Sequence, residues 1–264
     1  MDYIIVQVRT STKVNRKYPC KTRIFSRAPR MGGCSNDDSK WVELLFQYII
    51  AHMGDQIIYF TPERLFRDLV IKYTPKDLGD LIRILRKAKN KEDREVFFSG
   101  ILASGFIYID ARDIRVRAFD KDEDVDTEII DVTIYNQNQQ LPKKERKNDV
   151  WRIQNVTITE YDFIAAKKKG NTNFYKVISD HLERTKVGKH TADYSGTILH
   201  FHFQLQVEGE ADVEELRRYI RKVNNNKFTQ IWMTSFSSKD YKQCWILEVV
   251  QNEGKAIPFP IKVM

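Results

Sequence analysis

The chain has 264 residues, 42% of them hydrophobic and 30% charged, with only 11 Gly and 7 Pro. This composition excludes a mostly disordered chain and a collagen-like repeat, and the length predicts one large domain or two ordinary ones. No apolar run approaches the roughly 18 to 20 residues that a membrane span needs, so we expect no membrane partner. Three Cys, an odd number without CxxC spacing, predict free thiols in a reducing, intracellular compartment.

Positive charge is concentrated at the N-terminus. The net charge is +8, and residues 1–30 carry almost all of it, since they hold eight cations against one acid, Asp2. The cations are Arg9, Lys13, Arg16, Lys17, Lys21, Arg23, Arg27 and Arg30. Tyr18 and Phe25 lie among them, a mixture typical of segments that contact phosphates and stack on bases. The segment predicts an arm that binds single- or double-stranded nucleic acid; a solvated tail or a contact to an acidic protein is the alternative.

The first half of the chain has the pattern of a helical domain. We interpret residues 1–38 as the basic arm and residues 39–140 as a domain of helices with a terminal β-hairpin. Four helices are predicted. The first spans residues 41–53, the second begins at Thr61-Pro62, the third begins at Thr74-Pro75, and the fourth spans residues 93–103 and is ended by Gly105. Residues 106–109 and 114–119 are expected to pair as strands. Helices followed by a β-ribbon predict a winged-helix-like domain.

The second half alternates strands and helices. Residues 141–150 are polar and aperiodic, so we interpret them as a linker to a domain over residues 151–264. The predicted strands cover residues 153–159, 197–207 and 228–234, the predicted helices cover residues 173–184 and 212–223, and residues 238–248 are partly helical or a further strand. The fold class is therefore α+β, in which a C-terminal antiparallel sheet has helices packed on one face.

One predicted strand carries two histidines. Side chains alternate across a sheet, so Leu199, Phe201 and Phe203 are expected in the core while His200 and His202 share the opposite face. Two imidazoles at positions i and i+2 are within reach of a single metal ion. The alternative is a half-exposed strand whose polar face includes two histidines.

Residues 200–206, His-Phe-His-Phe-Gln-Leu-Gln, followed by Glu208-Gly209, resemble the second motif of HUH endonucleases. The similarity is greatest to the Rep-type initiators of rolling-circle replication in small circular single-stranded DNA viruses, and it spans about residues 151–252. It implies that His200 and His202 hold Mg²⁺ or Mn²⁺ together with an upstream carboxylate, for which Asp193 is the candidate.

The same resemblance implies a tyrosine nucleophile that attacks a DNA phosphodiester. Tyr241 has the corresponding place in the fold, and Tyr219 is held in reserve because Tyr219-Ile-Arg-Lys222 spells the family's Tyr-x-x-Lys. Cys244 stands where that spelling needs Lys after Tyr241, and the chain has no GxxxxGK[ST] loop, so it lacks the helicase usually coupled to viral Reps. An active nickase and a Rep-like fold that has lost catalysis are both open.

The charge pattern predicts a nucleic-acid-binding protein. The resemblance implies an HUH/Rep-like domain, either as a metal-dependent single-stranded DNA nickase or as a fold that has lost catalysis. The alternative is a non-catalytic nucleic-acid-binding or structural protein of a viral or chromatin-like assembly, with protein partners or as a homo-oligomer. Both fit a nuclear or virion-associated location. A protein-interaction scaffold is a third interpretation.

Overall fold

The computed structural model describes residues 3–7, 56–118, 127–187, 194, 196–203, 212–236, 241–250 and 255–261. The chain divides into two compact units, essentially Tyr3–Tyr59 and Phe60–Met264. In the first unit only β1 (Tyr3–Gln7) and β2 (Gln56–Phe60, up to Tyr59) are described. The rest of the predicted basic arm, the helix predicted over residues 41–53 and the candidate ligand Asp193 lie outside the described residues.

The second unit opens with the helices α2 (Pro62–Tyr73) and α3 (Leu78–Leu85). The predicted start at Thr61-Pro62 is confirmed, because the Thr61 side chain accepts a hydrogen bond from the backbone N–H of Arg64. The predicted start at Thr74-Pro75 is wrong by one turn. Thr74 instead ends α2 in a left-handed conformation (φ 44°), and Asp77 caps α3.

Helix α4 (Lys91–Asp110) is longer than predicted. Residues 106–109 belong to it, so the predicted helix end at Gly105 and the strand after it are wrong. Gly105 is buried within the helix, where an added Cβ would lie 2.6 Å from Cδ1 of Ile246. The glycine therefore permits a close approach of the helix to the sheet, which a sequence pattern cannot distinguish from a helix stop.

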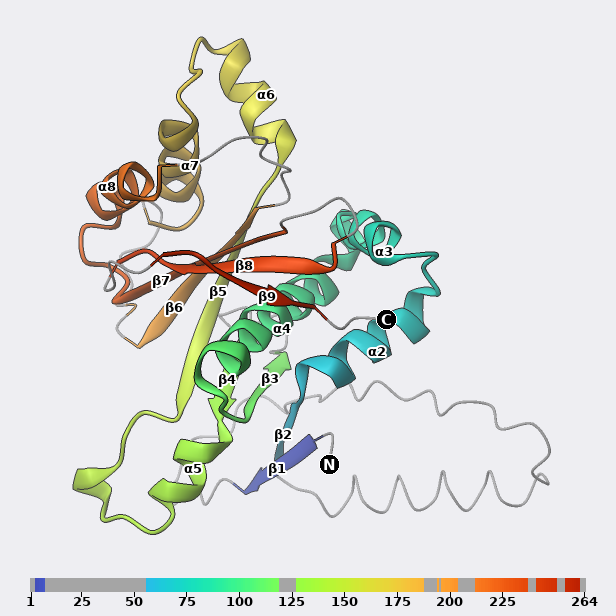
Figure 1. Cartoon of the computed structure of the whole chain (residues 1–264), viewed down its shortest axis with the longest axis vertical. Coiled ribbons are helices and arrows are strands. Elements are labelled where there is room, and N and C mark those ends of the chain that lie inside the picture. The colour runs from blue at the N-terminus through green and yellow to red at the C-terminus, as the bar shows by residue number, and fades with distance from the viewer. Residues whose placement is uncertain are drawn as a thin grey trace, which may run out of the picture. The chain divides into compact units, whose positions relative to one another are not determined.

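A mixed sheet forms the centre of the second unit (Figure 1). Its strands are β3 (Ile114–Ala118), β4 (Thr127–Asp131), β5 (Val150–Ile158), β6 (Thr197–Phe203), β7 (Gln230–Phe236), β8 (Gln243–Glu248) and β9 (Ile257–Pro260), neighbours in chain order. Phe60, at the end of β2, pairs with Val116 of β3. The predicted α+β class is confirmed.

The prediction of an antiparallel C-terminal sheet is wrong at its centre. Strands β5, β6 and β7 run parallel, whereas β3–β4–β5 and β7–β8–β9 are antiparallel. The connections explain the difference, because parallel neighbours need a crossover that returns the chain to the same end of the sheet. Helices α6 (Glu160–Lys168) and α7 (Phe174–Leu182) form the first crossover, and α8 (Val213–Asn224) forms the second.

Helices cover both faces of the sheet, which corrects the prediction of a single covered face (Figure 1). Leu199, Phe201 and Phe203 of β6 pack with α7 and α8, as the alternation predicts. The opposite face of β6 packs under α4, in a core that also contains apolar residues of α2 and α3. Every residue of β6 is buried as a result.

Residues 141–150, predicted as a linker, connect two paired strands of this sheet. Strand β4 pairs antiparallel with β5, with Thr127 opposite Ile153. Between them lie α5 (Val132–Asn138) and a short 3₁₀ turn (Lys143–Glu145). The Asn138 side chain donates to the carbonyl oxygen of Lys147 (2.8 Å) and accepts from its N–H (3.0 Å), which ties the segment down. Among the described residues, no helix has the length and apolar character that crossing a bilayer requires.

Candidate functional site

The two histidines of β6 lie in the interior. His200 and His202 are both 0% exposed and point toward α4. The ring of Phe98, on α4, stacks on His202 with centroids 4.3 Å apart, and the ring of Phe236 meets it edge-on at 4.9 Å. Strand β6 thus has the predicted alternation, but its polar face is a buried layer and not a cleft.

A directional chain of hydrogen bonds engages three of the four nitrogens of the two imidazoles. Asn155 Nδ2 lies 3.4 Å from the backbone carbonyl of Glu95, which can only accept, so Asn155 Oδ1 faces His200 and accepts from its Nδ1–H (2.8 Å). His200 Nε2 is then an acceptor, and the Thr234 hydroxyl donates to it (2.8 Å). The Thr234 oxygen in turn accepts from His202 Nδ1–H (2.7 Å).

Both imidazoles are neutral because they are completely buried. In the neutral form His202 Nε2 carries a lone pair that is buried without a hydrogen-bond partner among the described residues. Burial lowers the pKa of His200 to about 3, and burial together with the neighbouring His200 and Arg86 lowers the pKa of His202 well below its usual value. The pair therefore stays uncharged throughout the physiological pH range.

The described residues do not fit a metal ion held by this pair. An ion shared by His200 and His202 would lie between their facing nitrogens, but the Thr234 hydroxyl occupies that position with short bonds to both. Mg²⁺ and Mn²⁺ also prefer oxygen ligands to imidazole nitrogens. In the described part of the chain, no group of three or more His, Cys, Asp or Glu side chains could hold a metal ion.

The two candidate nucleophiles lie on opposite sides of the sheet. Tyr241 precedes β8 in a left-handed conformation (φ 58°), and its half-buried ring meets Phe236 edge-on at 4.9 Å. Phe236 therefore lies between Tyr241 and His202. Tyr219, on α8, stacks on Tyr175 of α7 on the far side. The structure brings Tyr241 to the face of the histidines and separates Tyr219 from them.

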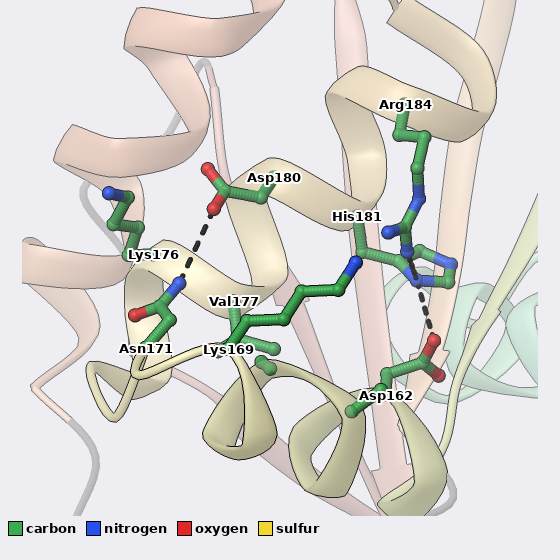
Figure 2. A pocket seen from close by; sticks show the side chains of 10 residues that line it. Asp162, Lys169, Asn171, Lys176, Val177, Asp180, His181 and Arg184 are labelled. Atoms are coloured by element: carbon green, nitrogen blue, oxygen red, sulfur yellow. Dashed lines mark hydrogen bonds and ion pairs between the residues drawn. The ribbon is translucent and has the colours of Figure 1, made fainter.

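A second group of polar side chains lines a cavity of about 290 Å³ between α6 and α7 (Figure 2). Its polar lining residues are Asp162, Lys169, Asn171, Lys176, Asp180, His181 and Arg184. Ala165, Ala166 and Val177 supply its apolar part. The sequence analysis assigned no role to this cavity.

An aspartate–histidine pair lies at the inner end of this cavity. The Asp162 carboxylate lies 2.9 Å from His181 Nδ1, and the two side chains are only 20% and 13% exposed. Its other oxygen accepts from the backbone N–H and the hydroxyl of Thr159, each at 2.8 Å, in a capping box that begins α6. Burial would raise the pKa of Asp162, but these bonds from His181 and Thr159 outweigh it and lower the pKa to about 2.

The sequence contains a local signal for Asp162 but none for His181. Thr159-x-x-Asp162 spells a capping box and could have located α6, which the sequence analysis missed. Nothing in the sequence connects Asp162 with His181, because they meet only when α7 folds against α6.

No family model, no curated protein and no solved structure matches this chain.

Proposed function

We propose that the protein binds nucleic acid through its basic N-terminal arm without performing chemistry on it. The observation that carries the proposal is the concentration of eight cations against one acid in residues 1–30. Cations so arranged bind phosphates and release counterions, whatever the sequence of the nucleic acid. The remaining chain is close to neutral, so binding by the arm would dominate.

The histidine geometry supports a binding function over a catalytic one. A nickase of the HUH type needs both histidines at a site that DNA can reach, whereas here they are buried and use three of their four nitrogens in internal hydrogen bonds. In the proposed protein they stabilise the sheet against α4. A nuclear or virion-associated location, protein partners and self-association remain part of this proposal, as do the winged-helix-like and Rep-like descriptions of the two halves.

The test is the salt dependence of binding to fluorescently labelled single- and double-stranded oligonucleotides. We compare the full chain with a variant in which Arg16, Lys17, Lys21 and Arg23 are changed to Gln. The matched control changes Lys143, Lys144, Arg146 and Lys147 to Gln, because these four cations are exposed and give the same change in net charge. We expect the slope of log affinity against log salt to fall by about 3 in the arm variant, at roughly 0.7 to 0.9 per lost phosphate contact. Equal losses in both variants would contradict the proposal.

A single-stranded DNA nickase is the second candidate function, although the described residues around the histidines do not fit the metal ion that such an enzyme uses. Its support is the placement of His200, His202 and Tyr241 on one face of the sheet, with Tyr241 only half-buried at the edge. In this candidate Tyr241 is the nucleophile, and Tyr219 on the opposite face is not. Its signature is a covalent bond between the protein and DNA, which a pure binding protein never forms.

A further inference from the structure

The cavity between α6 and α7 has the charge of an anion site. Three cationic side chains, Lys169, Lys176 and Arg184, lie around two carboxylates, Asp162 and Asp180. One of the carboxylates, Asp162, is already engaged by three hydrogen-bond donors from Thr159 and His181. Asp180 lies 3.4 Å from the Asn171 side-chain nitrogen. Lys169 and Arg184 are the two cations that lie beside His181 in Figure 2. Neither of them forms an ion pair with Asp162 or Asp180, the two carboxylates of the lining in the described part of the chain.

His181 is oriented by its partner. The 2.9 Å contact to the Asp162 carboxylate, which can only accept, places the proton of the imidazole on Nδ1. The Arg184 guanidinium lies 3.4 Å from the same nitrogen. It does not donate a hydrogen bond to Nδ1, because the protonated Nδ1 has no lone pair to accept one. His181 Nε2 is therefore turned away from Asp162. Figure 2 shows the Lys169 side chain reaching across the cavity toward this ring.

From this arrangement we propose that the cavity binds the phosphate group of a phosphate monoester. The Arg184 guanidinium offers the forked donors that match phosphate oxygens, and Lys169 adds a compact charge. The three cations of the lining outnumber its two carboxylates by one, which favours an anionic ligand. The volume of about 290 Å³ is at the lower end for ligand cavities and is large enough for a phosphate group.

The site is independent of the proposed function of the arm. Its ligand could be free phosphate, a nucleotide or the terminal phosphate of a nucleic-acid strand, and all three present the same chemical group. The chain has only five histidines, so the imidazole C–H signals of the full-length protein form a simple NMR spectrum in which His181 can be assigned with a His181→Gln variant.

The experiment titrates the full chain with inorganic phosphate, with adenosine monophosphate, and with a short oligonucleotide bearing either a 5′-phosphate or a 5′-hydroxyl. We expect the His181 signal to shift with each phosphate monoester and with inorganic phosphate, and not with the 5′-hydroxyl oligonucleotide. Lys169→Ala should weaken the affinity about tenfold, the effect of losing one charge-assisted contact. Lys168→Ala is the matched control, because Lys168 is the last residue of α6, directly before Lys169, and does not line the cavity.

A His181 signal that stays unchanged with every phosphate, or equal weakening by the two lysine variants, would overturn the proposal. Both lysines are exposed, so neither variant threatens the fold. The four-fold Gln variant of the arm separates the two proposals: it should bind nucleic acid with a smaller salt dependence and keep the response of His181 to inorganic phosphate.

Discussion

Thr234 connects the two buried histidines, and its hydroxyl is both donor and acceptor. Replacing it with Val keeps the shape of the side chain but leaves His200 Nε2 and His202 Nδ1 without partners in a site that is 0% exposed. An unsatisfied buried polar atom costs about 1 to 3 kcal/mol. We expect Thr234→Val to lower the free energy of unfolding by about 2 to 4 kcal/mol, measured by urea denaturation.

The control for this variant is Thr133→Val, an identical change at an exposed position of α5. It should alter the stability by less than about 0.5 kcal/mol, as surface substitutions usually do. If both variants are equally stable, the hydroxyl does not connect the histidines as described.

The neutral histidines also predict how stability depends on pH. Their pKa values are lower in the folded than in the unfolded chain, so the unfolded state binds more protons once the pH falls below about 6.5. Stability is therefore fully present above that pH and is lost as the pH falls toward 3, at up to about 1.4 kcal/mol per pH unit for each histidine.

A single substitution tests whether the two histidines cause the loss of stability at low pH. His202→Phe keeps an aromatic ring against Phe98 and removes one titrating group. We expect the slope of unfolding free energy against pH, measured by urea denaturation between pH 6 and 4.5, to fall by about half. Above pH 4.5 Asp162, whose pKa is lowered to about 2, adds little to this slope. An unchanged slope in the variant would mean that other groups cause the acid sensitivity.

At the scale of single elements, α4 depends on glycines where it meets other parts of the core. Gly105 faces Ile246 and Gly100 faces Phe66, whose ring would lie 2.8 Å from an added Cβ. Gly105→Ala should lower the free energy of unfolding by about 1 to 2 kcal/mol, because overpacking outweighs the gain in helix propensity.

A second substitution separates overpacking from other causes. Ile246→Val removes the Cδ1 atom that the new methyl group would meet at 2.6 Å. In the background of Ile246→Val, Gly105→Ala should therefore be neutral or stabilising when the two are compared by thermal unfolding. A loss of stability in both backgrounds would place the strain elsewhere.

The elements differ in how far the sequence predicted them. Local signals were sufficient for α2, α7 and α8, since Thr61, Asn173 and Asp212 are caps whose side chains bond the first turn. They failed for α4, where Gly105 has a tertiary role. Alternation in β6 placed Phe201 and His202 on opposite faces correctly, but no sequence pattern says whether a polar face is covered by another element.

At the scale of the second unit, the two predicted halves share one sheet and one core. The core under α4 includes Phe97 and Leu81 from the helical half together with Ile153, Ile198 and Phe236 from the later strands. Pairing of β4 with β5 joins the halves through backbone hydrogen bonds. The pattern of residues 141–150 indicates a polar connection, and sequence alone does not tell a connection within a sheet from one between domains.

This shared core makes a prediction about fragments. Residues 60–264 contain strands β3 to β9 with α4, whereas residues 151–264 lack the helix and would expose the face that carries His200 and His202. We expect the longer fragment to unfold in one sharp urea transition and the shorter one to show none. A shorter fragment of equal stability would show that the second half is an independent domain.

We propose that the protein binds nucleic acid and leaves it intact. The most direct measurement incubates the full chain with end-labelled single-stranded DNA and Mn²⁺ and resolves the products on a denaturing gel, while the same samples are measured for binding across a salt series. The account predicts salt-sensitive binding and no cleavage product or covalent adduct. An adduct that forms in the natural sequence and disappears in Tyr241→Phe and His202→Ala would contradict it and establish the nickase.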